Sequence, residues 1–386
     1  MDYFLTDEEK ALQEKARTIA ETLILPVRDE LDEKAEFPRE IIKEMGKQGM
    51  LSIFIPKEFG GTGGKIMDMC IACEEVARVC GGVATAYAVS ALGAGPIIFF
   101  GTEEQKKKYL PKIATGELLC AFGLTEAQAG SDVANIQTTA QRDGDFYILN
   151  GVKQFISNGS IAEIYVVLAS SDKSKGARGI SAFIVEKGTP GFSFGKEENK
   201  LGIRTSTTTE LVFEDCRVPK ENLMGKEGFG FIYTMRNFDR ARPGVGAIAL
   251  GIAQGAYEEV LDFTYRRNLL NSQYVQRKVA DMATEIEAAR ALLYATARMI
   301  DSGAKNFTKE ASFAKLYPSD VAMIITTAAI ELMGPYGVLK DYHVEKMLRD
   351  AKISQIYEGT NEIQRAVIAL ELTREMGKRE RQRRER

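Results

Sequence analysis

Apolar residues recur at helical spacing in the first third of the chain. The apolar positions between residues 12 and 23 fall on one helical face, and Thr6 and Glu9 before them have the spacing of an N-terminal capping box. Proline and glycine residues then interrupt the pattern, and helical spacing resumes over about residues 67–90. The pattern predicts a helical region that extends to about residue 117.

From about residue 118 the pattern changes to short, alternating runs typical of β-strands. The segment YILNGVKQFISNG contains two such runs joined by Asn150-Gly151, a dipeptide that favours a tight hairpin turn. The other strand candidates are each bounded by Gly, Pro or Asp, and they are IYVVLAS, GISAFIVEKG, GFSFG and TTTELVFEDCRVP. These runs predict a sheet domain in the middle of the chain.

From about residue 228 helical spacing returns and continues to the end. A one-sided apolar stripe of this length is typical of a helix in an antiparallel bundle, and it consists of Val279, Met282, Ile286, Ala289, Leu293, Ala297 and Ile300. Helices, then strands, then helices predict an α+β protein. We expect an N-terminal helical domain at 1–117, a central β domain at 118–227 and a C-terminal helical bundle at 228–386.

The composition is that of a globular protein with two or three domains. The 386 residues are 45% apolar and 27% charged, and we find no run of 18 or more uncharged apolar residues, so we expect no membrane span. The start, MDYFLTDEEK, lacks the features of a targeting signal, which predicts a cytoplasmic location. The net charge of −3 argues against nucleic acid as a partner, and the basic tail KRERQRRER is interpreted as a solvated terminus.

The histidine and cysteine content argues against several classes of enzyme. A Ser-His-Asp triad or a histidine-rich metal site would have to form around the single histidine, His343, whose polar surroundings favour a surface or capping role. The five cysteines are scattered, and we interpret them as buried thiols rather than as a redox or zinc site; they are Cys70, Cys73, Cys80, Cys120 and Cys216. The sequence therefore predicts no metal.

The motif with the clearest chemistry is IYEGTNEIQR near the C-terminus. Thr360 is placed to cap a helix that begins at Asn361, so the residues before it lie at a helix N-terminus. Exposed N–H groups and the helix dipole favour an anion there, such as a diphosphate. Glu358 suits a carboxylate directed into a cavity, although a surface glutamate has the same local pattern. A Rossmann site is not indicated, since GVGAIALG follows DRARP rather than a strand.

Three further motifs offer polar groups close together. AFGLTEAQAGSD places hydroxyls beside a glycine turn, KQFISNG places an aromatic ring and a serine on one face of a strand, and FDRARP pairs an acid with an arginine. Taken singly, each is also the pattern of an ordinary loop, strand or surface ion pair. The residues concerned are Thr125, Ser131, Phe155, Ser157, Asp239 and Arg242.

In this order and at this spacing, the four motifs resemble the acyl-CoA dehydrogenase family over essentially the whole chain. The resemblance implies an N-terminal helical domain, a central β-barrel-like domain and a C-terminal four-helix bundle, assembled as a homotetramer (a dimer of dimers). It implies FAD as cofactor, an acyl-CoA substrate and an electron-transfer flavoprotein as partner. In the implied reaction, Glu358 abstracts the α-proton and flavin N5 takes the β-hydride, which leaves the 2-enoyl-CoA.

The resemblance also implies which residues contact ligands. Phe155 matches an aromatic residue that packs on the isoalloxazine ring, and Ser131 a position near both flavin and CoA. The implied cofactor-binding residues are Phe122, Leu124, Thr125, Ser131, Phe155, Ser157, Arg267, Gln273, Glu331, Gly334, Tyr357, Thr360 and Glu362. The implied substrate-binding residues are Ser131, Phe238, Asp239, Arg242, Glu358 and Gly359.

Some residues depart from the family pattern. The segment after Arg267 is about five residues short, and Glu331 and Pro335 stand where the family usually has Gln and Gly. We therefore expect FAD to bind but to be held differently at its adenylate end. Ala241 stands where two family branches carry the base, which favours Glu358, and Ala84 replaces an arginine that grips dicarboxylic substrates.

Two alternatives stay open at this point. The same site run in reverse would make an enoyl-CoA reductase, because direction depends on the flavin potential and the partner. A non-catalytic acyl-CoA-binding homologue would keep the fold without needing a base at position 358. The acyl group itself is left open among short, branched and cyclic chains.

Overall fold

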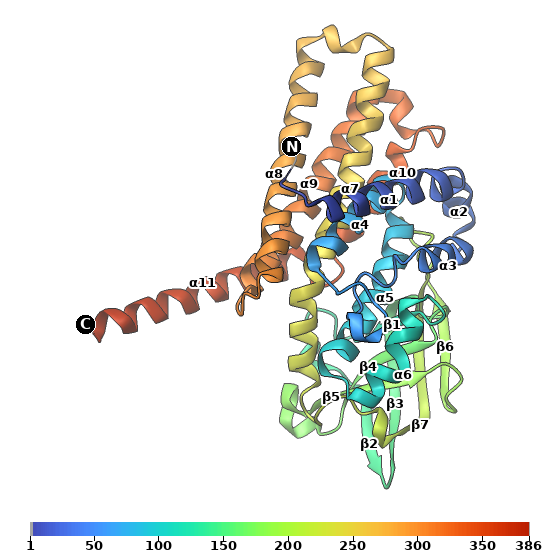
Figure 1. Cartoon of the computed structure of the whole chain (residues 1–386), viewed down its shortest axis with the longest axis vertical. Coiled ribbons are helices and arrows are strands. Elements are labelled where there is room, and N and C mark those ends of the chain that lie inside the picture. The colour runs from blue at the N-terminus through green and yellow to red at the C-terminus, as the bar shows by residue number, and fades with distance from the viewer. Residues whose placement is uncertain (1–2, 386) are drawn as a thin grey trace.

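The computed structural model describes residues 3–385, in three successive blocks of helices, strands and helices (Figure 1). Thr6 caps the first helix and Glu9 completes the capping box, as the sequence predicts. Residues 60–65 form a loop before the fourth helix. The helices of the first block are α1 (Asp7–Ile19), α2 (Arg28–Lys34), α3 (Arg39–Lys47), α4 (Ile66–Val79), α5 (Gly81–Phe100) and α6 (Glu103–Ala114).

The second block is one curled sheet of seven strands, which lies at the lower end of the molecule in Figure 1. The strand order is β1-β4-β2-β3-β7-β6, with β5 also paired to β4. Strands β1 and β2 run parallel to β4, and the other pairs are antiparallel. The strands are β1 (Cys120–Gly123), β2 (Thr139–Asp143), β3 (Phe146–Ser157), β4 (Ile164–Ser170), β5 (Ile180–Glu186), β6 (Phe192–Glu197) and β7 (Thr208–Pro219).

The third block is the helical bundle. The predicted apolar stripe lies on the second of its helices, and the stripe residues from Met282 to Ile300 are buried. The predicted α+β architecture, with a sheet domain between helical regions, is confirmed. The helices are α7 (Gly230–Arg266), α8 (Gln273–Asp301), α9 (Thr308–Met333), α10 (Val344–Lys352) and α11 (Asn361–Arg384).

The hairpin predicted at Asn150-Gly151 is wrong. These residues lie inside the continuous strand β3, and the pairing of β3 with β7 shifts register there. Gly151 has a φ of 147°, and a Cβ at this position would lie 2.6 Å from the Thr138 hydroxyl. Glycine is therefore required by a bulge and a close approach, not by a turn. The hairpin turn instead follows β2, where Gly144 has a φ of 58°.

Within residues 3–385, two helical segments are long and apolar enough to cross a membrane by length and composition, namely α5 and Thr308–Val338. A search of the sequence for unbroken runs of 18 or more uncharged apolar residues does not detect them. In the most apolar window of α5, 67% is buried inside the protein, against 44% in the second segment. Packing explains the α5 composition, because a Cβ at Gly95 would lie 2.1 Å from Asn237 of α7.

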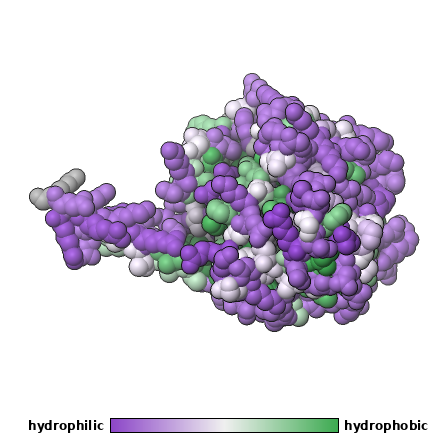
Figure 2. All heavy atoms as spheres, turned by 90° about the horizontal axis from the view of Figure 1, so that it is seen from below, coloured by the Kyte–Doolittle hydropathy of each residue, from purple (hydrophilic) through white to green (hydrophobic). Residues whose placement is uncertain are grey.

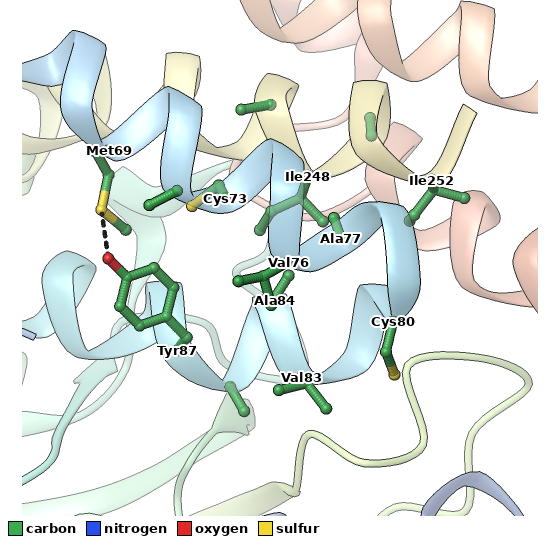
Figure 3. Close-up of a cluster of buried hydrophobic side chains, with 14 of the residues drawn as sticks. Met69, Cys73, Val76, Ala77, Cys80, Val83, Ala84, Tyr87, Ile248 and Ile252 are labelled. Atoms are coloured by element: carbon green, nitrogen blue, oxygen red, sulfur yellow. Dashed lines mark hydrogen bonds between the residues drawn. The ribbon is translucent and has the colours of Figure 1, made fainter. Parts of the chain in front are cut away.

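The main core lies where α4, α5 and α7 meet (Figure 3). Cys73 of α4, Tyr87 of α5 and Ile248 of α7 point into it, and the Tyr87 hydroxyl lies 3.6 Å from Met69 Sδ. The five cysteines are all buried free thiols, as predicted. The small residues of GVGAIALG allow close helix packing, because a Cβ at Gly246 would lie 1.9 Å from a backbone oxygen of α9.

The last helix, α11, leaves the body of the molecule and projects outward (Figure 1). Seen from below, its outer part presents a polar surface (Figure 2). The basic tail is helical as far as Arg384, and residues 378–385 are exposed.

Candidate active site

Glu358 lies in the short turn between α10 and α11, and its backbone is unusual. Its φ of 50° is in the left-handed region that residues with a side chain rarely adopt, and Gly359 beside it has a φ of 92°. The Thr360 hydroxyl accepts a hydrogen bond of 3.3 Å from the Ile363 N–H, so it caps α11 as predicted. The turn thus fixes the direction of the Glu358 side chain from both sides.

The Glu358 carboxyl group is held in a dry environment. The residue as a whole is half-buried, but its Oε2 atom is shielded from solvent and has no hydrogen-bond partner among the described residues. Burial raises the pKa of Glu358 to about 7, and the positive charges of Arg242 and Lys315 oppose that rise. A carboxyl group with such a pKa is poised to accept a proton near neutral pH.

Arg242 and Asp239 of α7 form a buried ion pair near this turn. Arg242 Nη1 lies 2.9 Å from Asp239 Oδ1 and donates to the Ser312 hydroxyl of α9 at 3.2 Å, while the Thr308 hydroxyl donates to Asp239 Oδ2 at 2.7 Å. Only 6% of the Arg242 side chain is exposed. An exposed ion pair, which the motif by itself also allowed, is therefore not what forms.

Two side chains that the sequence did not single out hold the turn itself. Lys315 Nζ donates to the Gly359 carbonyl at 2.9 Å, and Gln364 Nε2 donates to the same oxygen at 3.0 Å and to the Glu358 carbonyl at 3.2 Å. Lys315 was detectable as a lysine within the otherwise apolar helical run ASFAKLY, which is an uncommon place for a charge.

The motifs on β1 and β3 meet beside the α7 motif. The Gln154 N–H donates to the Thr125 carbonyl at 2.8 Å, which joins the LTEA segment to β3. The rings of Phe122 and Phe238 meet edge to face, with their centroids 5.8 Å apart. Sequence segments far apart are thus brought together between the sheet and α7.

Phe155 and Ser157 end the strand β3 on this side. Phe155 has a φ of 60° at an irregularity in the pairing with β7, and 57% of its surface is exposed. Ser157 and Thr125 are half-buried, whereas Leu124 is buried. An exposed aromatic ring beside two accessible hydroxyl groups fits a flat, polar-edged ring system such as isoalloxazine.

A buried ion pair lies directly beneath this surface. Lys153 Nζ lies 2.8 Å from Glu126 Oε1 and donates to the Leu124 carbonyl at 3.0 Å, and both side chains are almost fully buried. Burial lowers the pKa of Lys153 to about 8. The pair ties β3 to the loop that carries Thr125, and sequence reasoning missed it.

The remaining predicted site residues lie elsewhere. Ser131 is exposed in the loop after β1, and Glu362 is exposed in the first turn of α11. The other four lie at the end of the bundle away from the sheet, at or beyond the ends of α7, α8 and α9 (Figure 1); they are Arg267, Gln273, Glu331 and Gly334. One chain therefore does not bring these four together with Glu358.

The side chains that most often bind metal ions are dispersed in the described part of the chain. Across residues 3–385 no group of three or more His, Cys, Asp and Glu residues could hold a metal ion. His343 directly precedes α10, where it makes no capping hydrogen bond, and its Nδ1 lies 2.9 Å from Asp29.

Three family models match successive parts of the chain. Residues 6–117 match the acyl-CoA dehydrogenase N-terminal domain, residues 121–216 the middle domain and residues 228–373 the C-terminal domain. The fold and the site therefore define a flavin-dependent oxidoreductase: the chain belongs to the acyl-CoA dehydrogenase family, uses FAD, and oxidises an acyl-CoA thioester to the 2-enoyl-CoA.

Individual relatives extend this assignment. A short-chain-specific acyl-CoA dehydrogenase of Clostridium acetobutylicum is 47% identical over 96% of this chain and 99% of its own length. The butyryl-CoA dehydrogenase structure from Megasphaera elsdenii is 44% identical, covers 97% of this chain and 100% of its own, and has a TM-score of 0.94.

A further similar chain is found in a structure of the electron transferring flavoprotein of Acidaminococcus fermentans. It is 47% identical, covers 96% of this chain and 99% of its own, and also has a TM-score of 0.94. Other similar proteins are also named acyl-CoA dehydrogenases, and one similar protein, from Anaerotignum propionicum, is named an acryloyl-CoA reductase (NADH).

Proposed function

We propose that Glu358 is the base that removes the α-proton of the thioester. The observation that carries this proposal is a shielded carboxylate oxygen with no hydrogen-bond partner among residues 3–385, in a carboxyl group whose pKa is raised to about 7. A carboxylate in water is far too weak a base for a thioester α-proton. Burial raises the pKa of the carboxyl group and so makes the carboxylate a stronger base. FAD, when bound, supplies the acceptor for the hydride that leaves the β-carbon.

The charge that develops on the thioester oxygen needs a donor, and the turn offers one. The Glu358 N–H donates no hydrogen bond to any group within residues 3–385. The family resemblance implies that this backbone N–H and a ribityl hydroxyl of the flavin stabilise the developing enolate. The free N–H supports the same role here, since a preorganised donor stabilises charge in the transition state without reorganising.

The remaining site residues take roles on either side of this carboxylate. Thr125, Phe155 and Ser157 contact the isoalloxazine ring, with Phe122, Leu124 and Ser131 close by, while Tyr357, Thr360 and Glu362 line the flavin side of the turn. Asp239 and Arg242 bind and orient the CoA thioester with Phe238 and Gly359. The buried hydrogen bonds of Asp239 and Arg242 support a fixed rather than a mobile arrangement.

The substrate class that fits best is a short-chain acyl-CoA. Two similar dehydrogenases are named as short-chain-specific, and a similar solved structure is that of a butyryl-CoA dehydrogenase. Burial raises the pKa of the Cys73 thiol in the α4–α5–α7 core, and the Glu358 charge adds to that rise.

An electron-transfer flavoprotein is the proposed electron acceptor, and a tetramer the proposed assembly. The partner is supported by the similarity to a chain in the electron transferring flavoprotein structure. Arg267, Gln273, Glu331 and Gly334 would then contact the adenylate end of a neighbouring subunit's FAD, which is consistent with their distance from Glu358 within one chain. The departures at Arg267, Glu331 and Pro335 point to an altered grip on that end.

The test is anaerobic bleaching of the flavin-loaded enzyme by butanoyl-, octanoyl-, hexadecanoyl- and glutaryl-CoA. We expect the fastest bleaching with butanoyl-CoA, and we expect Glu358→Gln to slow it by about a thousandfold while thioester binding persists. Bleaching of Glu358→Gln at the parental rate would show that another residue is the base. Faster reduction by hexadecanoyl-CoA would contradict the short-chain assignment. Reoxidation of the reduced flavin by an enoyl-CoA, with no bleaching by any saturated thioester, would favour the reverse reaction.

A further inference from the structure

Lys315 is a buried lysine for which the proposed chemistry has so far given no role. It lies in the middle of α9, and none of its surface is exposed. Its Nζ donates to the Gly359 carbonyl at 2.9 Å and to Asn361 Oδ1 at 2.8 Å. A charged group is buried at considerable cost unless its partners compensate for lost hydration, so its presence calls for an explanation.

The partners of Lys315 are the residues that follow the proposed base. Asn361 is itself fixed, because its Nδ2 donates to the Ser319 hydroxyl at 2.9 Å and to Asp320 Oδ1 at 2.7 Å. Gln364 holds the Gly359 carbonyl from the other side. The carbonyl oxygens of Glu358 and Gly359 thus accept hydrogen bonds from side chains of α9 and α11.

These hydrogen bonds stabilise a strained backbone conformation at Glu358 and Gly359. Glu358 has a left-handed φ of 50°, and such residues persist where the surrounding contacts enforce them. Without donors to the Glu358 and Gly359 carbonyls, the turn can relax to an ordinary conformation. The carboxylate and the Glu358 N–H would then both change direction.

The charge of Lys315 acts on the same residue. It lowers the Glu358 pKa, and the Glu358 charge in turn raises that of Lys315. Burial is nevertheless the main influence on Lys315 and lowers its pKa to about 8. The other ionisable groups that act on the pair are Arg242, Asp320, Glu362, Cys73 and Tyr357.

We propose that Lys315 is a positioning residue which, together with Gln364, holds the strained Glu358–Gly359 turn and favours the ionised form of the Glu358 carboxylate. The inference rests on the proposed role of Glu358 as base. Lys315 does not itself move a proton in the reaction. It keeps its charge while the α-proton passes to the Glu358 carboxylate.

The first test compares three variants by the pH dependence of flavin reduction. Lys315→Met keeps the length of the side chain but removes its charge and donors, and we expect the apparent pKa of the reductive step to rise by about one unit, with about tenfold slower reduction at neutral pH. Gln364→Met removes only the hydrogen bonds to the Glu358 and Gly359 carbonyls, and should slow reduction without moving that pKa. Lys315→Arg keeps the charge, and should restore the pKa while the rate stays below that of the parent.

The matched control is Lys200→Met. Burial lowers the pKa of Lys200 too, and its Nζ donates to the Ser206 carbonyl at 2.8 Å, but it has no contact with the turn. We expect the parental pH profile from this variant. An unchanged profile in Lys315→Met would overturn the proposal, while an inactive Glu358→Gln in the same series would leave the base assignment intact.

A second measurement uses the unmodified protein, so it does not depend on whether Lys315→Met folds. Carbon-13 NMR of labelled glutamate carboxyl groups, with the Glu358 signal assigned from Glu358→Gln, follows the titration directly. We expect a Glu358 titration curve centred near a pH of about 7 that is broader than the curve of an isolated carboxyl group, because Lys315 loses its charge in an overlapping range, near a pH of about 8. A curve with the width of a single independent group would mean that the two groups do not interact, which would sink the electrostatic half of the proposal.

Discussion

At the scale of the residue, burial and nearby positive charges have opposite effects on the pKa of the Glu358 carboxyl group. Burial raises the pKa of Glu358, and Arg242 and Lys315 moderate the rise, which leaves it at about 7. Without those charges the group would stay protonated and could not accept a proton. Without the burial it would be too weak a base.

The pH dependence of flavin reduction follows from this balance. Below a pH of about 7 the Glu358 carboxyl group is protonated and cannot take the α-proton, so the rate should rise with pH through about 7 and then level off. Stopped-flow reduction by a saturating short-chain thioester from pH 5.5 to 8.5, in about ten steps, measures it. A rate that falls as the pH rises through 7 would contradict a carboxylate base.

The sequence singled out the proposed base, Glu358, but not the side chains that hold its turn. Glu358, Thr360 and Arg242 lie in short motifs whose local pattern and family resemblance are visible in one dimension. Lys315 acts on a carbonyl 44 positions further along the chain, and only the docking of α9 against the turn makes that contact. Such long-range pairs leave no local signal beyond an unexpected polar residue.

At the scale of the element, close packing of strands and helices, rather than turn formation, explains why glycine is needed at several positions. The sequence placed a hairpin at Asn150-Gly151, although Gly151 is needed because β3 passes the Thr138 side chain closely. The small residues of GVGAIALG in α7 do serve close helix packing, since a Cβ at Gly246 would lie 1.9 Å from the Ala314 carbonyl oxygen. A strong dipeptide signal gives no information about a third strand or a neighbouring loop.

Gly246→Ala tests the packing of α7 on α9. Its Cβ would lie 1.9 Å from the Ala314 carbonyl oxygen, and we expect the free energy of unfolding to fall by about 2 kcal/mol or more despite the better helix propensity of alanine. Gly377→Ala in α11 is the control, because nothing lies within 4 Å of its added Cβ. Denaturant unfolding of both variants measures the difference, and equal stabilities would refute the packing argument.

At the scale of the whole molecule, the chain has two separate sets of cofactor-binding candidates. One set lies around Glu358 and β3, and the other lies at the end of the bundle away from the sheet. Arg267 in the second set lies over the rings of Phe263 and Tyr336, at 4.6 and 4.0 Å from their centroids. These contacts, together with the neighbouring Tyr342, hold the guanidinium group in place at the surface.

Arg267→Met tests whether the second set serves a cofactor in a neighbouring subunit. We expect the assembled variant to lose a larger share of its FAD on gel filtration than the parent, because an anion-binding group is removed. Arg277→Met, on the exposed surface of α8, is the control and should retain FAD as the parent does. Flavin absorbance per protein, with the molar mass from light scattering, gives the comparison. Equal retention in both variants would argue against a role for Arg267 in FAD binding.

The left-handed backbone at Glu358 also has a consequence for how this enzyme can be improved. Glycine at position 358 would release the conformational strain and would leave no buried carboxyl group to desolvate. Screens for thermal tolerance alone should therefore select against the base, and a more heat-resistant protein could emerge that has lost its turnover. Engineering this scaffold calls for selection on rate and durability together.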